Sequence, residues 1–121
     1  MIYIGNDIVE NFRIIRLINI YGNKFLDKIF SSKEINSIKR KDPSTSYSGK
    51  FAAKEASAKA LMSSGLVSRV SLKDIEILSK DNGVPFIKLN NIQLYKIKNF
   101  KISISHTSQY AAAVALLELF E

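Results

Sequence analysis

The chain has 121 residues, no cysteine, a single histidine and a formal net charge of +7. This length suits one domain with its own hydrophobic core, and the lack of cysteine excludes disulfide frameworks and thiolate metal sites. The positive charge favours anionic partners, which include nucleic acid, a membrane surface, a phosphorylated small molecule or an acidic protein.

The N-terminal segment does not have the pattern of a signal peptide. It lacks a basic region and reaches Asp7 before any apolar run develops. The longest apolar stretch, residues 110–117, is too short to span a bilayer. We therefore expect a cytoplasmic protein without membrane contacts.

The first predicted elements are a strand and a helix. Closely spaced isoleucines predict a short strand that ends near Asp7. A helical period follows over residues 10–21, with Phe12 on its apolar face. Arg13 and Arg16 are neighbours on another face of the same helix.

More helices are predicted towards the middle of the chain. Residues 24–30 predict a short helical piece, and the capping-box pattern Ser31–Glu34 predicts the start of another helix. An alanine-rich helix then begins either at Pro43, with Asp42 as its N-cap, or only at Ser48.

The alanine-rich helix ends near Gly65 and carries one carboxylate, Glu55, in its middle. At 100° per residue, Glu55 lies on an apolar stripe beside a face made of Ala52, Ala53, Ala56 and Ala60. The i,i+4 spacing to Lys59 allows a simple surface ion pair. A carboxylate bordered by apolar positions, however, loses water and needs a partner. The pattern alone leaves both interpretations open.

The second half of the chain predicts four strands, over residues 74–80, 84–89, 101–106 and 110–119. Asn82–Gly83 between the first two is a strong hairpin signal. The chain has no repeat, low-complexity segment or linker. We therefore predict one α+β domain over residues 1–121, with an antiparallel sheet packed against the long alanine-rich helix and shorter N-terminal helices.

Asp7 is a second candidate for chemistry. At a strand end its carboxylate is placed either to hold a cation or to cap the following helix. Asp7 and Glu55 together supply two oxygen ligands, and Mg²⁺ usually binds one or two carboxylates and completes its shell with water and substrate phosphates. The spacing of the two residues does not show that they meet.

His106 and the basic residues each have a structural and a functional interpretation. Strand alternation places His106 on the face of Ile102 and Ile104. With no cysteine and no second histidine, a hydrolytic triad or zinc site has little support, which leaves a phosphate-contacting or orienting role open. The basic cluster of residues 13–28 is either a solvated face or a docking surface for an acidic partner.

Taken together, these segments resemble the holo-acyl-carrier-protein synthases, the small bacterial class of 4'-phosphopantetheinyl transferases. Residues 4–14, IGNDIVENFRI, are similar to the family's opening Gly-x-Asp-Ile-Val-Glu-x-x-Arg-Ile motif. Residues 50–61, KFAAKEASAKAL, resemble its Arg-Phe-Ala-Ala-Lys-Glu-Ala helix. Residues 102–115 resemble its closing hairpin, and residues 74–89 match the hairpin before it.

The resemblance implies a magnesium-dependent transfer of the phosphopantetheine arm of coenzyme A to a serine of an apo acyl carrier protein, which supports fatty acid biosynthesis. Adenosine 3',5'-bisphosphate is the implied leaving group. The family forms homotrimers with active sites at subunit interfaces, so the resemblance implies the same assembly here. Both implied substrates are acidic, which agrees with the net charge of +7.

The resemblance also implies residue roles. Asp7 and Glu55 match the metal ligands, and with Lys59 they form the expected catalytic set. We expect coenzyme A contacts from eight residues: Lys50, Lys54, Lys59, Gly65, Asn82, Pro85, His106 and Thr107. Arg13 matches an arginine that pairs with the carrier, and the neighbouring Arg16 and Lys24 extend that expected carrier surface.

The sequence departs from the family pattern at three places. Lys50 stands where arginine is usual, Met62–Gly65 replaces a glycine-rich turn, and Val84 replaces a common lysine. The alternative function is a basic α+β module that binds RNA without catalysis. That alternative explains the charge but not the carboxylate in the middle of the alanine-rich helix.

Overall fold

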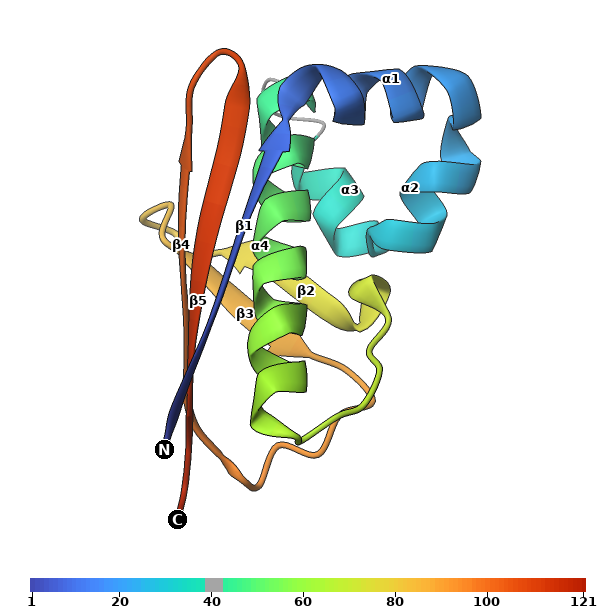
Figure 1. Cartoon of the computed structure of the whole chain (residues 1–121). Helices are drawn as coiled ribbons and strands as arrows, with labels where there is room; N and C mark the ends of the chain where they lie inside the picture. The colour runs from blue at the N-terminus through green and yellow to red at the C-terminus, as the bar shows by residue number, and fades with distance from the viewer. Residues whose placement is uncertain (39–42) are drawn as a thin grey trace.

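The computed structural model describes residues 1–38 and 43–121, with the backbone alone at residues 43–45. Its elements follow one another along the chain as Figure 1 shows: β1 (Ile2–Glu10), α1 (Asn11–Tyr21), α2 (Asn23–Ile29), α3 (Ser32–Ile38), α4 (Pro43–Ser64), the 3-10 helix η1 (Leu72–Asp74), β2 (Ile75–Ser79), β3 (Pro85–Leu89), β4 (Ile97–His106) and β5 (Tyr110–Leu119). The predicted α+β class is confirmed.

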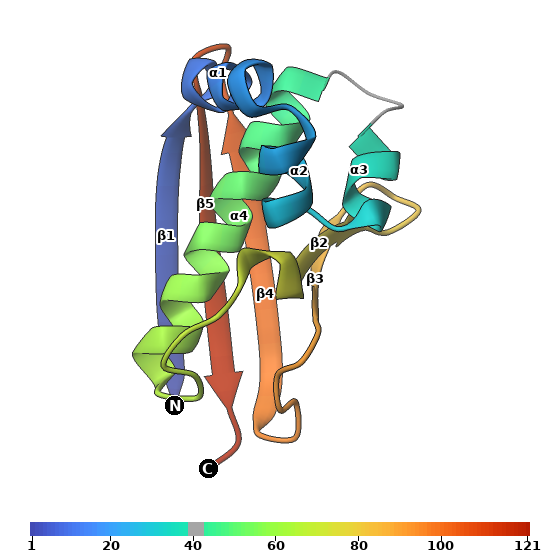
Figure 2. The same ribbon diagram turned by 90° about the vertical axis from the view of Figure 1, so that its right-hand side faces the viewer.

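The strands form two antiparallel sheets, where the sequence predicted one. The larger has the order β1-β5-β4, and β2 pairs with β3 in a separate two-stranded sheet. Helix α4 lies along one face of the larger sheet, while α1, α2 and α3 lie on the side of α4 away from it (Figures 1 and 2). The long helix is therefore the central element, with neighbours on both sides.

Small residues bring α4 close to β1. The predicted alanine face is fully buried at Ala52, Ala53, Ala56 and Ala60. A Cβ atom added at Gly5 of β1 would overlap the carbonyl oxygen of Ala56 and lie 2.8 Å from the amide nitrogen of Ala60. Only glycine permits this approach. This contact sets the distance between β1 and α4, and therefore the distance between the neighbouring side chains of the two elements.

The N-terminal region differs from the prediction in two respects. Strand β1 continues its ladder with β5 as far as Glu10, so Asp7 lies in mid-strand and does not cap the helix. Helix α1 begins at Asn11, and its buried face contains Asn11 and Ile14. The placement of Phe12 on the apolar face was wrong, because this side chain is 70% exposed.

The local signals of the middle region are confirmed. In the capping box, the Ser31 amide donates to Glu34 Oε1 at 2.9 Å and the Glu34 amide donates to Ser31 Oγ at 3.2 Å. Helix α4 takes the earlier predicted start, Pro43, whereas the predicted N-cap Asp42 lies outside the described residues. It is followed by Gly65 at φ +78°.

The β2–β3 hairpin is also confirmed, with residues 80–84 between its strands and a β-turn over residues 80–83. The Gly83 amide donates to the Lys80 carbonyl oxygen at 2.8 Å, and Gly83 has a positive φ of +86°. Within the described part of the chain, no helix combines the length and the apolar character that crossing a bilayer requires.

Candidate active site

Asp7, Glu55 and Lys59 meet where β1 packs on α4. Asp7 points to the α4 side of the sheet, and Lys59 Nζ lies 3.1 Å from Asp7 Oδ1. The same ammonium group donates to the Asn6 carbonyl oxygen at 3.0 Å. The predicted alternative of a Glu55–Lys59 ion pair is therefore replaced by an Asp7–Lys59 pair between strand and helix.

Glu55 is a half-buried carboxylate beside Asp7. Burial raises its pKa above the usual value, and the negative charge of Asp7 raises it further. The positive charges of Lys59 and Arg13 act in the opposite direction but do not cancel the rise. Two carboxylates thus lie within electrostatic reach of each other, and among the described residues Glu55 forms no ion pair.

This donor set fits a hard divalent cation. A cation between Asp7 and Glu55 would relieve their mutual repulsion, which adds to burial in raising the pKa of Glu55. The described residues contain no group of three or more histidine, cysteine, aspartate or glutamate side chains suited to a metal. Two protein carboxylates with water and phosphate oxygens match the usual surroundings of Mg²⁺, not those of structural Zn²⁺.

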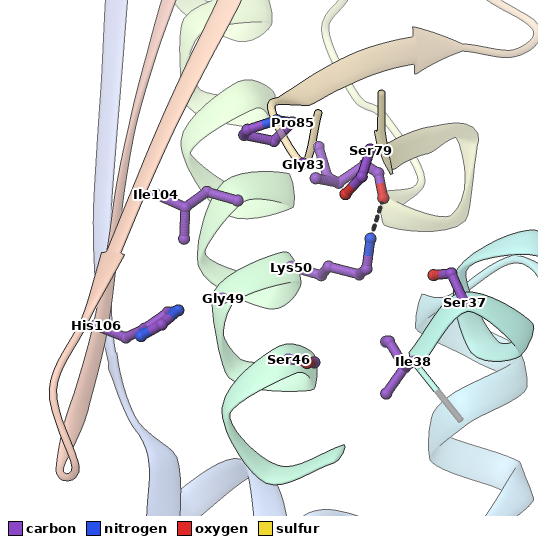
Figure 3. Close-up of a pocket in the computed structure, with 11 residues that line it drawn as sticks. Ser37, Ile38, Ser46, Gly49, Lys50, Ser79, Gly83, Pro85, Ile104 and His106 are labelled. Carbon is purple, nitrogen blue, oxygen red and sulfur yellow. Dashed lines mark hydrogen bonds between the residues drawn. The ribbon is translucent and has the colours of Figure 1, made fainter. Parts of the chain in front are cut away.

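A second set of predicted residues lines a cleft of about 270 Å³ at the first half of α4 (Figure 3). Lys50 projects from α4, His106 lies at the end of β4, and Pro85 begins β3. Serines at positions 37, 46 and 79 add hydroxyl groups to the same cleft. The arrangement combines one cation, one imidazole and several hydroxyl groups around an open space, which suits an anionic ligand.

Two details show how α4 contributes to this cleft. Lys50 Nζ donates to the Ile77 carbonyl oxygen on β2, so its side chain extends from α4 to that strand (Figure 3). A Cβ atom added at Gly49 would lie 3.2 Å from Ile104 Cγ2 and 3.8 Å from His106 Cδ2. Glycine in mid-helix, which costs about 1 kcal/mol relative to alanine, therefore leaves room beside His106.

Lys54 was wrongly expected to contact coenzyme A. Its side chain is fully buried, and Lys54 Nζ lies 2.7 Å from Glu34 Oε1. The ammonium group also donates to the carbonyl oxygens of Leu72 at 2.8 Å and Ile75 at 2.7 Å. All three of its hydrogens have acceptors inside the protein. Lys54 therefore joins α4 to α3 and β2 and has no donor left for an external ligand.

Glu34 is the residue that sequence reasoning missed. Besides closing the capping box, its carboxylate accepts the Ile77 amide at 2.9 Å through Oε2 and pairs with Lys54 through Oε1. The capping-box pattern predicted only the local contact. The sequence did carry one signal for this contact: Lys54 lies within an alanine-rich, buried stretch. A lysine in such a place requires a carboxylate partner.

The remaining predicted contacts lie on turns and helix surfaces around these groups. Asn82 Oδ1 accepts the Val84 amide at 3.1 Å in the hairpin turn. Thr107 Oγ1 accepts the amides of Gln109 at 3.1 Å and Tyr110 at 3.0 Å in the β4–β5 turn. Gly65 follows the far end of α4. Three predicted carrier contacts are exposed on α1 and α2: Arg13, Arg16 and Lys24.

The site residues of one chain therefore fall into two separate groups. The cleft group includes Lys50, and the carboxylate group includes Lys59, nine positions further along α4. At a rise of about 1.5 Å per residue, roughly 13.5 Å of helix separates Lys50 from Lys59, and about 7.5 Å separates Lys50 from Glu55. The two groups also use different neighbours, since Lys50 bonds to β2 and Lys59 bonds to β1.

A family model described as the 4'-phosphopantetheinyl transferase superfamily matches residues 3–115. The chain belongs to this superfamily. The holo-[acyl-carrier-protein] synthase of Protochlamydia amoebophila is 42% identical over 116 residues, which cover 93% of this chain and 94% of that protein. The resemblance predicted from three motifs and the predicted enzyme class are both confirmed.

Solved structures agree with this assignment. A holo-[acyl-carrier-protein] synthase from Helicobacter pylori, in complex with coenzyme A, is 36% identical with a TM-score of 0.83 over 95% of this chain and 99% of that chain. The corresponding protein from Neisseria meningitidis is 30% identical with a TM-score of 0.85 over 98% of this chain and 99% of that chain.

Proposed function

We propose that the protein transfers the 4'-phosphopantetheine group of coenzyme A to a serine of an apo acyl carrier protein. The observation that carries this proposal is the meeting of Asp7, Glu55 and Lys59 at the Gly5 contact between β1 and α4. The serine oxygen forms a bond to the phosphorus that carries the pantetheine arm, and the bond from that phosphorus to the bridging pyrophosphate oxygen breaks. Adenosine 3',5'-bisphosphate leaves with the electron pair, and the serine proton is released to solvent. The product is a holo carrier for fatty acid biosynthesis.

In this proposal Asp7 and Glu55 hold Mg²⁺, which when bound neutralises negative charge on the pyrophosphate. Lys59, whose side chain is 50% exposed, turns from Asp7 towards a substrate phosphate. Phosphoryl transfer depends mainly on positioning and charge stabilisation, so two carboxylates and a few cations are sufficient protein groups. Lys50, Pro85 and His106 form the cleft that receives the nucleotide end of coenzyme A.

A homotrimer with shared sites would bring the two groups of site residues together. The face of the larger sheet away from α4 exposes an apolar set: Ile2, Ile4, Ile8, Val114 and Leu116. Contiguous exposed apolar surface of this kind marks an interaction site. Asp7 and Lys59 line a groove of about 420 Å³ that continues onto this face at Ile8 and Val114. A neighbouring chain on that face would therefore adjoin the carboxylates.

The carrier would dock on α1. Phe12, Arg16 and Ile20 are exposed and four positions apart, so they form one stripe on the helix, with Arg13 beside it. Such a stripe offers both apolar contact and positive charge to an acidic partner, and the charge speeds encounter and fixes orientation. Arg13 also lies within electrostatic reach of Glu55, which places this surface near the carboxylates.

The basic RNA-binding alternative gains no support from the family or from the relatives described above. The cytoplasmic location remains a prediction. Incubation with coenzyme A, Mg²⁺ and an apo carrier should raise the carrier's mass by one phosphopantetheine group. An unchanged carrier mass with every cognate carrier, together with RNA binding that is insensitive to Asp7→Asn and Glu55→Gln, would overturn the proposed function.

A further inference from the structure

Asn11, the first residue of α1, holds the turn between β4 and β5. Its side chain is buried, with 4% of the residue exposed. Asn11 Nδ2 donates to the carbonyl oxygens of Thr107 and Ser108, both at 3.1 Å. The backbone amide of Asn11 donates to the Gln109 carbonyl oxygen at 2.9 Å. One residue thus binds three consecutive carbonyl groups of the turn.

The amide of Asn11 can take only one orientation. Carbonyl oxygens only accept hydrogen bonds, so the side-chain NH₂ must face the turn. Its own oxygen, Oδ1, consequently points elsewhere and is buried without a partner among the described residues. An unsatisfied buried acceptor is destabilising, and an apolar residue of the same shape would avoid it. What asparagine contributes here is the hold on the turn, which is made by the two hydrogen bonds that Nδ2 donates.

This turn lies between the proposed coenzyme A cleft and the helix that carries the proposed carrier surface. It carries Thr107 and follows His106, the residue that lines the cleft. Asn11 itself begins the helix that carries Arg13. The backbone on either side is paired in ladders that end at His106↔Ala111 and Glu10↔Tyr110, so the turn extends beyond regular pairing.

Thr107 closes the turn from within, by accepting the amides of Gln109 and Tyr110. These two hydrogen bonds set the shape of the turn but not its position relative to α1. Among the hydrogen bonds of the described residues, those that join α1 to the turn all come from Asn11. Position and shape are therefore controlled by different residues.

We infer that Asn11 is a positioning residue, which holds the turn after His106 against the start of α1 so that the coenzyme A cleft and the carrier surface keep one arrangement. The inference rests on the proposed function for its kinetic consequence. Its structural part, the hold on the turn, does not depend on any activity.

The kinetic test compares Asn11→Leu with Asn19→Leu, a substitution at an exposed position of the same helix. Leucine removes both donated bonds and also the unsatisfied oxygen, so the melting temperature of Asn11→Leu should stay within a few degrees of the wild type. We expect its KM for coenzyme A to rise about fivefold or more, with kcat changed less. Asn19→Leu should leave the KM for coenzyme A unchanged.

A second variant separates positioning from stability. Asn11→Asp keeps the shape but places a carboxylate against two carbonyl oxygens, so both the melting temperature and the affinity for coenzyme A should fall. A solely structural role for Asn11 would lower the folded fraction without changing the KM of the molecules that remain folded. A KM for coenzyme A within twofold of the wild type in Asn11→Leu would overturn the inference.

Hydrogen exchange distinguishes failure of the inference from failure of the proposed function. In the ligand-free protein, the backbone amide of residue 11, which donates to the Gln109 carbonyl oxygen, should exchange about tenfold faster in Asn11→Leu than in Asn19→Leu. If the wild type shows no transfer, the proposed function fails, and this measurement still decides whether Asn11 holds the turn. Equal exchange rates in the two variants would show that it does not.

Discussion

Helix α4 carries two lysine–carboxylate contacts, and their difference separates structure from function. Lys54 and Glu34 are both completely buried, and every donor of Lys54 is used. Lys59 and Asp7 retain side-chain exposures of 50% and 18%, and they lie beside Glu55, whose pKa is raised. A buried pair with all its hydrogen bonds made can only hold elements together. In a half-exposed pair next to a second carboxylate, the lysine can turn to a substrate phosphate while a metal cation takes its place between the carboxylates.

The largest expected effect comes from removing one carboxylate of the open pair. Asp7→Asn or Glu55→Gln should lower the rate of transfer at least about a thousandfold, because each removes a proposed metal ligand. The free energy of unfolding should stay near the wild-type value or rise, since the repulsion between the two groups disappears. Carrier mass measurements and thermal melting test the two parts. As a matched control, the exposed Glu121→Gln should transfer at the wild-type rate.

The buried pair should show the opposite behaviour. Lys54→Met leaves the Glu34 carboxylate buried without its cation, and breaking such a pair costs about 3–5 kcal/mol of stability. Lys59→Met, at the open pair, should cost less than about 1 kcal/mol. Urea unfolding of both variants measures the difference. Similar losses for the two would contradict the distinction drawn between the pairs.

The close approach of β1 and α4 offers a third way to test the comparison. Gly5→Ala inserts a methyl group against the Ala56 carbonyl, and overpacking of this kind costs about 1–3 kcal/mol. Because the helix must move away from the strand, Asp7 and Glu55 should also separate, and transfer should fall by more than the loss of folded protein explains. Activity measured per folded molecule, with folding followed by circular dichroism, separates the two effects.

The smallest expected effects concern pH. The raised pKa of Glu55 means that its charged form is disfavoured in the folded protein, so its unfavourable contribution is present at neutral pH and is relieved as the pH falls through that pKa. Mg²⁺ favours the charged form. The rise in melting temperature that Mg²⁺ produces should therefore be greater at pH 7.5 than at pH 5, by roughly a few degrees, and should be absent in Glu55→Gln.

The pKa of Glu76 is shifted in the opposite direction from that of Glu55. Burial alone would raise its pKa, but hydrogen bonds from Asn90 and Ser31 outweigh burial and hold the pKa below the usual value. Its contribution to stability is present above the pKa of the unfolded chain and is lost as the pH falls through the lower folded value. Glu76→Gln should therefore destabilise the protein at neutral pH and have less effect in acid.

Much of the fold could be predicted because its signals are local. The capping box at Ser31–Glu34, the Asn82–Gly83 turn and the alanine face of α4 each depend on a few neighbouring residues. The motif resemblance added the family, which is confirmed, and the metal site shared by Asp7 and Glu55, which stays a prediction. The wrong predictions are the end of β1 near Asp7, the single sheet, and the side of the element that is covered at Phe12 and Lys54; each concerns tertiary packing. That depends on elements distant in the chain.

The sequence by itself determined the elements, their order and the chemical types available for a site. Only the tertiary structure decided that Asp7 lies in mid-strand beside Glu55, and that Lys54 points inwards to Glu34 while Lys59 remains half exposed. The physical reason is distance along the chain. Asp7 and Lys59 are 52 positions apart, and their meeting depends on the packing of Gly5 against Ala56 and Ala60, which no local pattern encodes.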